Sequence, residues 1–256
     1  MNALWERPDF RRAAGDAWRP GGVALTNRAL DWCAASGWLP QGGLVLDLGS
    51  GAGATLRLLA GRGYRAVGLD KNVGTEPLAG ENLTDTWCLV RADLARPPLA
   101  AACVDCVLCE CVLSLLADPL AALKAALGVL RPGGLLVVSD LMLRQGYAPA
   151  TVGCAASGHG VSAGKNSVSG VGALGSSCLA GARAEAAWGG LMEAAGFTVM
   201  HFEDNSRALL ELAARMVWYG DEPTGHGNIC ACGGATPGKA LRAYGYGLWI
   251  ARKETL

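Results

Sequence analysis

A glycine-rich run at residues 44–55, LVLDLGSGAGAT, has the residue types and spacing of a ligand-binding turn. Its GxGxG glycines, which let a backbone approach a ligand closely, are Gly49, Gly51 and Gly53. Asp47 precedes them, and Ala54 stands where the dinucleotide fingerprint GxGxxG has its third glycine. Because a carboxylate would repel a pyrophosphate at the helix N-terminus, the run favours a cationic ligand without phosphate. A nicotinamide dinucleotide is the alternative.

Four cysteines within nine positions form a second group that could do chemistry, as metal ligands or as a redox device. They are Cys103, Cys106, Cys109 and Cys111. Residues three apart on a strand lie on opposite faces, so the strand expected here cannot aim the first three at one metal ion. We interpret Cys103 and Cys106 as small buried hydrophobic residues and expect no metal. Cys109 and Cys111 flank Glu110 at the end of that strand and are site candidates.

Composition limits the classes of partner. The 256 residues carry 22 basic and 22 acidic side chains, with no basic run, which argues against a nucleic-acid partner. The N-terminal residues lack the apolar core of a signal peptide, and no apolar run approaches the ~20 residues that span a bilayer. We therefore expect a cytoplasmic protein without a membrane partner, whose ten cysteines are mostly free thiols.

The elements that must position these residues alternate between strand and helix. Apolar runs predict strands at 43–49, 65–70, 87–93, 104–110, 134–140, 197–204 and 244–253. Helical spacing predicts helices that include 54–61, 118–134, 182–197 and 206–220. Asp118 suits the N-cap of the second of these helices and Pro119 its first position. This order is typical of an α/β doubly wound sheet with right-handed crossovers.

We predict one domain over residues 1–256. Its parts are an N-terminal cap at 1–40, a cofactor-binding core at 41–141, a Gly/Ser-rich lid at 142–182 and a C-terminal part at 183–256. The lid is predicted because its composition buries little apolar surface.

Four segments in this order resemble the motifs of class I S-adenosylmethionine-dependent methyltransferases, of the methyltransferase domain 11/25 kind. They are VLDLGSGAG, GLD at 68–70, RAD at 91–93 and LRPGGLLVVSD at 130–140. The resemblance implies a Rossmann-like seven-stranded sheet whose last strand is antiparallel. It also implies S-adenosyl-L-methionine as the cofactor.

The resemblance assigns roles to individual residues. Asp70 would take both ribose hydroxyls, Asp93 and Leu94 would meet the adenine edge, and the segment after the fourth strand would lie beneath the sulfonium. Trp18 and Arg19, from the N-terminal cap, are expected to close the site. The cofactor-binding candidates are then Asp47, Gly49, Ser50, Gly51, Gly53, Asp70, Lys71, Asp93, Leu94, Cys109, Trp18 and Arg19.

The expected function is methyl transfer to a small-molecule acceptor, with Glu110, Cys109 and Cys111 as catalytic candidates. One alternative is a soft metalloid or thiol acceptor, as in arsenite methyltransferases, because thiolates suit soft atoms. That alternative would also use the cysteines of later segments, Cys154, Cys178, Cys230 and Cys232. A second alternative is a protein that binds S-adenosylmethionine without catalysis.

Overall fold

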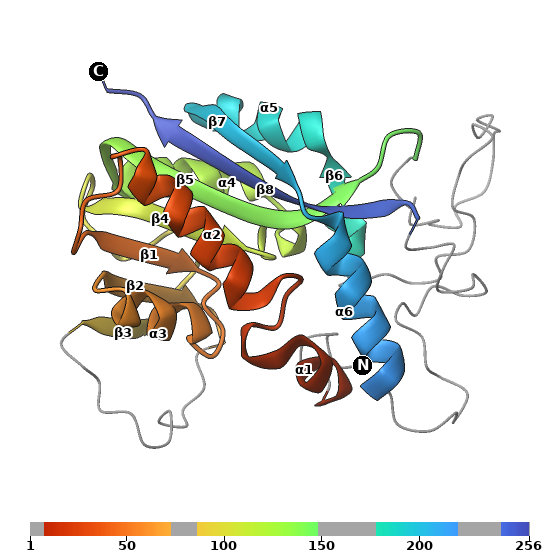
Figure 1. Ribbon diagram of the computed structural model, residues 1–256. Helices are drawn as coiled ribbons and strands as arrows, with labels where there is room; N and C mark the ends of the chain where they lie inside the picture. The colour runs from red at the N-terminus through yellow and green to blue at the C-terminus, as the bar shows by residue number, and fades with distance from the viewer. Residues whose placement is uncertain (1–7, 73–85, 148–177, 220–241, 256) are drawn as a thin grey trace.

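The computed structural model describes residues 8–72, 86–147, 178–219 and 242–255, and these build one mixed sheet covered by helices (Figure 1). The strands lie side by side in the order β3-β2-β1-β4-β5-β8-β7. Their bounds are β1 Leu44–Leu48, β2 Arg65–Asp70, β3 Trp87–Arg91, β4 Val104–Glu110, β5 Leu130–Leu143, β7 Phe197–Asp204 and β8 Tyr244–Lys253. A two-residue strand, β6 (Arg183–Ala184), pairs with β5 beside this path and makes the sheet eight-stranded.

The last strand runs against its neighbours, as expected from the sequence. β8 pairs in antiparallel register with both β5 and β7, whereas the pairs among β1 to β5 are parallel. The central parallel strands β1 and β4 are buried on both faces, and this explains their nearly continuous apolar sequences. The Rossmann-like fold predicted from the strand and helix pattern is thereby confirmed.

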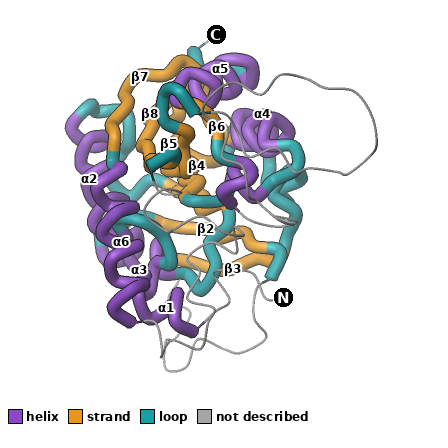
Figure 2. The backbone as a smooth tube through the Cα atoms, turned by 90° about the vertical axis from the view of Figure 1, so that its right-hand side faces the viewer, coloured by secondary structure: helices purple, strands orange, loops and turns teal. Residues whose placement is uncertain are grey.

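Two helical layers cover the sheet (Figure 2). The helices are α1 Pro8–Ala14, α2 Gly22–Ala35, α3 Ala54–Gly61, α4 Pro119–Val129, α5 Glu185–Ala195 and α6 Ser206–Tyr219, with short 3-10 turns η2 Gly15–Ala17, η3 Leu113–Leu115 and η4 Cys178–Gly181. Apolar side chains of α2 and α3 pack on one face of the sheet, and those of α4 and α5 pack on the other. None of the described helices is long and apolar enough to cross a membrane.

The helix expected over 118–134 is shorter in the structure. Asp118 caps it as predicted, accepting a hydrogen bond from the Ala121 N–H at 3.0 Å. The helix ends at Val129, however, and Leu130 already belongs to β5 because it pairs with Val104 of β4. Strand pairing therefore ends this helix three residues before Pro132, at which a helix would be interrupted in any case.

The cysteines of β4 alternate between the two faces of the sheet. Cys106 lies in the core beneath α2 and α3, while Cys109 lies in the core beneath α4 and α5, with Cys103 packed at its margin. Among the described residues, no group of three His, Cys, Asp or Glu side chains could hold a metal ion. The expectation that a spacing of three divides these thiols between faces is confirmed.

Candidate functional site

The carboxyl ends of β1, β2, β4 and β5 meet at one edge of the sheet, where ligands of open α/β sheets bind. Asp47 of β1, Asp70 of β2 and Glu110 of β4 all stand at this edge. Glu110 is in register with Ser139 of β5. The topology thus brings together acids that are far apart in the sequence.

The glycine turn has the left-handed backbone that its composition predicts. Gly49, Gly51 and Gly53 have φ angles of 77°, 52° and 78°. A Cβ atom at Gly49 would collide with the Val112 side chain, so glycine is required there by both backbone angle and space. The Gly51 N–H donates to the carboxylate of Asp70 at 3.0 Å and ties the turn to β2.

Asp47 is almost completely buried, with 3% of its surface exposed. Burial, with a smaller contribution from the negative charge of Glu110, raises the pKa of this carboxyl to about 7, against an opposing effect of Arg19. A buried carboxyl with a pKa near neutrality can change its charge when a cation binds beside it. Asp47 is therefore suited to respond to a positively charged ligand.

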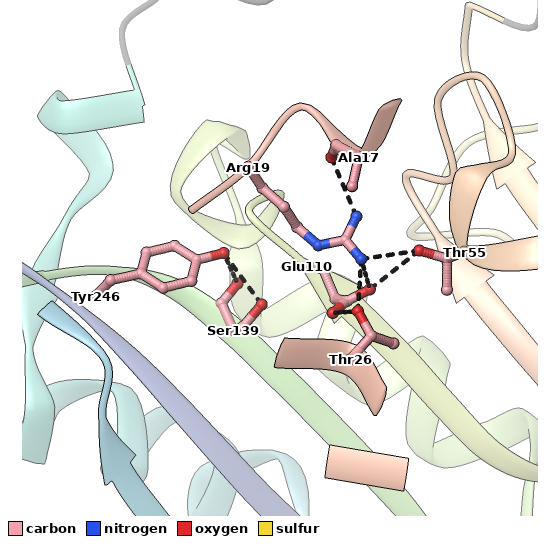
Figure 3. Close-up of polar contacts among 7 residues, drawn as sticks. All are labelled: Ala17, Arg19, Thr26, Thr55, Glu110, Ser139 and Tyr246. Atoms are coloured by element: carbon pink, nitrogen blue, oxygen red, sulfur yellow. Dashed lines mark hydrogen bonds and ion pairs between the residues drawn. The ribbon is translucent and has the colours of Figure 1, made fainter. Parts of the chain in front are cut away.

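A buried ion pair fills the centre of the site (Figure 3). Arg19, in the loop between η2 and α2, places Nη2 2.7 Å from Oε2 of Glu110, and both side chains are more than nine-tenths buried. Thr26 of α2 donates to Oε1 of Glu110 at 2.7 Å, and Thr55 of α3 donates to Oε2 at 3.2 Å. Three segments, the loop before α2, α2 itself and α3, therefore converge on one carboxylate at the end of β4.

Two polar side-chain atoms at this site have no hydrogen-bond partner among the residues that the structure describes. They are Nε of Arg19 and Oγ of Ser50, and both are buried. A buried donor without an acceptor is costly, so such atoms indicate a place for a polar ligand. Free donors, a guanidinium and several carboxylates together match the carboxylate, the ammonium and the sulfonium of S-adenosylmethionine. The residues present fit this cofactor.

Trp18, from the predicted N-terminal cap, lies beside the glycine turn. Trp18 adopts a left-handed conformation with φ 48° at the end of η2, and its ring lies beside Gly51. The Arg11 guanidinium stands 4.2 Å from the centroid of that ring. Trp18 and Arg19 are thus both brought to the loop that was expected to hold the cofactor.

The remaining sequence candidates lie around this centre. Asp93 is exposed after β3, where its carboxylate accepts a hydrogen bond from the Ala95 N–H at 3.0 Å. Leu94 packs against the core below α4, and Lys71 is exposed after β2. Their cofactor roles stay predictions.

Of the two candidate cysteines at the end of β4, only Cys111 shares a face of the sheet with Glu110. It follows the strand with φ 60°, is half-buried and packs against the core beneath α2 and α3. Cys109 belongs to β4 itself, and its thiol lies in the opposite core. Cys154, Cys230 and Cys232 fall outside the described residues, and Cys178 is described only as the first residue of η4.

Sequence reasoning missed Thr26, Thr55 and a tyrosine. Tyr246 of β8 is fully buried, and its hydroxyl lies 3.1 Å from Oγ of Ser139, beside the ion pair (Figure 3). The threonines could have been noticed as polar residues on the apolar faces of their helices. The tyrosine gave no such signal, because aromatic residues are common in strands.

Known proteins with similar structures share this fold, and a protein-family model matches the segment that holds the glycine turn. A family model described as "Methyltransferase domain" matches residues 46–138, from the strand before the glycine turn through most of β5. The matched span contains the turn, Asp70, Asp93 and Glu110.

Solved structures with a similar fold include enzymes of different chemistry. The cyclase SpnF has a TM-score of 0.63 at 20% identity, covering 94% of this chain and 85% of the cyclase. Geranyl diphosphate methyltransferase, solved with GPP and sinefungin, has a TM-score of 0.63 at 14% identity, covering 91% of this chain and 78% of its own. Phosphoethanolamine N-methyltransferase 2 of Haemonchus contortus, solved with S-adenosyl-L-methionine, has a TM-score of 0.62 at 16% identity, covering 96% of this chain and 56% of its own.

At these identities the likeness of structures establishes the fold, and the family match identifies the domain. Both agree with the glycine turn and with the acids at the ends of the strands. Residues 46–138 thus match the methyltransferase domain family, and this span carries the glycine turn and the strand-end acids of a Rossmann-like methyltransferase fold.

Proposed function

We propose that the chain transfers the methyl group of S-adenosylmethionine to a small-molecule acceptor at the carboxyl edge of β4 and β5. The observation that carries this proposal is the buried set of Asp47, Arg19 and Glu110 around the glycine turn. This set offers a positive charge to the carboxylate of the cofactor and negative charges to its ammonium and sulfonium groups. We also propose a cytoplasmic location, because none of the cysteines in the described residues forms a disulfide, as is usual in a reducing compartment.

Some residues of the site would bind the cofactor, and others would align it and exclude water. The cofactor, when bound, supplies a methyl group on a sulfonium that is reactive enough for alignment and exclusion of water to drive the transfer. Asp47 would balance the positive charge. Asp70 would hold the ribose hydroxyls with its two carboxylate oxygens, each of which also accepts one backbone N–H, from Gly51 and from Asn72. Trp18 and the α2 helix would exclude water from the turn.

Glu110 is the candidate to receive a hydrogen bond or a proton from the acceptor, because its carboxylate stands at the end of β4 beside Ser139. It is engaged with Arg19 and two threonines in the structure, so this role requires a change of partners.

The alternative of a soft metalloid or thiol acceptor, held by cysteines, has less support from the described residues. Of the thiols that it requires, Cys109 faces the opposite core, and Cys154, Cys230 and Cys232 lie outside the described residues.

The proposal is tested by calorimetry and by a product search. The parent should bind S-adenosylhomocysteine, and Asp70→Ala should bind it about 10- to 100-fold more weakly, the scale of losing charge-assisted hydrogen bonds. Incubation of the parent with S-adenosylmethionine and a metabolite extract should yield methylated small molecules by mass spectrometry. Binding without any methylated product would instead favour a non-catalytic binding protein.

A further inference from the structure

The buried ion pair of Arg19 and Glu110 is an arrangement that a protein does not keep without cost. Two charges more than nine-tenths buried lose their hydration, and mutual attraction only partly offsets that loss. The pair also joins the N-terminal cap to the sheet, since Arg19 lies before α2 and Glu110 ends β4. The pair stands beside the helix that follows the glycine turn, at the proposed cofactor site.

The hydrogen bonds of the guanidinium are unevenly distributed. Nη2 lies within bonding distance of three acceptors, which are Oε2 of Glu110 at 2.7 Å, Oγ1 of Thr26 at 2.6 Å and Oγ1 of Thr55 at 3.0 Å. Nη1 donates to the carbonyl of Ala17 at 3.1 Å, and Nε has no acceptor. One nitrogen is therefore crowded while its neighbour is unsatisfied.

This distribution has a consequence for any carboxylate that approaches Arg19. A guanidinium holds a carboxylate best by two parallel bonds from neighbouring nitrogens. Its two such edges are Nε with Nη2 and Nη1 with Nη2, and the two N–H groups of Nη2 already face three acceptors of the protein. An incoming carboxylate can complete a two-bond contact through Nε only if one of these acceptors gives up its place on Nη2. Glu110 is the one of the three that carries a negative charge and would repel the incoming carboxylate.

We propose that Glu110 occupies on Arg19 the place of the cofactor's α-carboxylate, and that cofactor binding frees Glu110 for the acceptor. This inference rests on the proposed function. Arg19 exchanges one carboxylate for another and stays paired, so no buried cation is left uncompensated. Glu110 keeps its two threonine donors and loses its arginine.

The exchange indicates the class of acceptor. A buried carboxylate without its cation favours a partner that donates hydrogen bonds or carries a positive charge. The acceptor should therefore present an amine or a hydroxyl to Glu110, and an acceptor whose reacting end is a carboxylate should be excluded by repulsion. The exchange also orders the reaction, since the acceptor site is complete only after the cofactor has bound.

The test compares two ligands of the full-length chain that differ in one part. S-Adenosylhomocysteine carries the amino-acid end, whereas 5′-methylthioadenosine has the same nucleoside and thioether without it. By calorimetry, Glu110→Gln should bind S-adenosylhomocysteine about 10-fold more tightly than the parent, because Arg19 no longer has a competing anion. Arg19→Gln should bind it at least 10-fold more weakly. Both variants should bind 5′-methylthioadenosine like the parent.

A double variant isolates the competition. Adding Glu110→Gln to Arg19→Gln should give no further gain in affinity for S-adenosylhomocysteine, because the competing pair no longer exists. Should Glu110→Gln fail to fold, Glu110→Asp keeps the charge, withdraws it by one methylene and should give a smaller gain. Weaker binding of S-adenosylhomocysteine by the Glu110 variants, or equal changes for both ligands, would overturn the exchange. A parent that binds neither ligand would instead contradict the proposed function.

Discussion

The buried carboxyl of Asp47 should make the stability of the protein fall as pH rises, and Asp47→Asn should remove that dependence. Burial raises the pKa of Asp47 from an ordinary value of 3.8 to about 7. Between these values the folded protein holds a proton that the unfolded chain has released. Raising the pH therefore favours the unfolded state, and the loss is complete above the folded pKa.

The size of the effect follows from the two pKa values. A difference of about 3 units corresponds to about 4 kcal/mol of unfolding free energy, at about 1.4 kcal/mol per unit, of which roughly 2–3 kcal/mol falls between pH 5 and pH 8. Asparagine has the shape of the protonated acid and cannot ionise. The unfolding free energy of Asp47→Asn, relative to that of the parent, should therefore rise by roughly 2–3 kcal/mol from pH 5 to pH 8. Asp140, whose pKa burial raises to about 6, acts in the same direction in both proteins and cancels in the comparison.

The assay is urea unfolding followed by tryptophan fluorescence at several pH values from 5 to 8, with a reductant to keep the cysteines as thiols. Asp93→Asn, which changes an exposed carboxyl near the same edge, is the control. A difference between Asp47→Asn and the parent that stays constant with pH would refute the reasoning, because Asp47 would then not hold a proton in the folded state.

Two further comparisons test the turn and the strand-four thiols. Gly49→Ala should lower the unfolding free energy by about 2–5 kcal/mol, from left-handed strain plus collision with Val112. Gly51→Ala should cost about 1–2 kcal/mol in the same urea assay, because its Cβ would meet the Trp18 ring only at ordinary contact distance and the strain remains. Cys106→Ser should lower the unfolding free energy by about 1–3 kcal/mol, because it puts a hydroxyl into an apolar core. Cys111→Ser should cost less, because Cys111 is only half-buried. Equal costs would contradict the different burial of the two thiols.

The sequence by itself determined the parts of the protein that depend on local pattern. The GxGxG turn between a buried strand and a helix specified the left-handed glycines, because those backbone angles are open to few other residues. The apolar run at 244–253 specified β8 to the residue, since a strand buried on both faces reads as a nearly continuous apolar segment. The predicted bounds of β7 also agree with the structure, although that strand is only partly buried. Alternation along β4 assigned Cys106 to a core without knowledge of what covers it.

Where local pattern and pairing competed, the tertiary structure decided. Residues 130–133 read as the end of a helix, yet Leu130 is extended because Val104 of β4 offers it a partner. Sequence patterns describe helix propensity and stop signals, but they do not say which strand lies alongside. The hydrogen bonds of a sheet join residues that are distant in the chain, so this boundary depended on the fold.

The chemistry of the site depended on the fold in the same way. Glu110 was recognisable as an acid at a strand end, but its partners come from separate elements, with Thr26 lying 84 residues before it and Thr55 lying 55. The pKa of Asp47 likewise reflects burial and the charge of Glu110, neither of which has a signature near residue 47. Electrostatic interactions act through space and desolvation depends on what covers a group, so only the folded chain could set the charges that meet the cofactor.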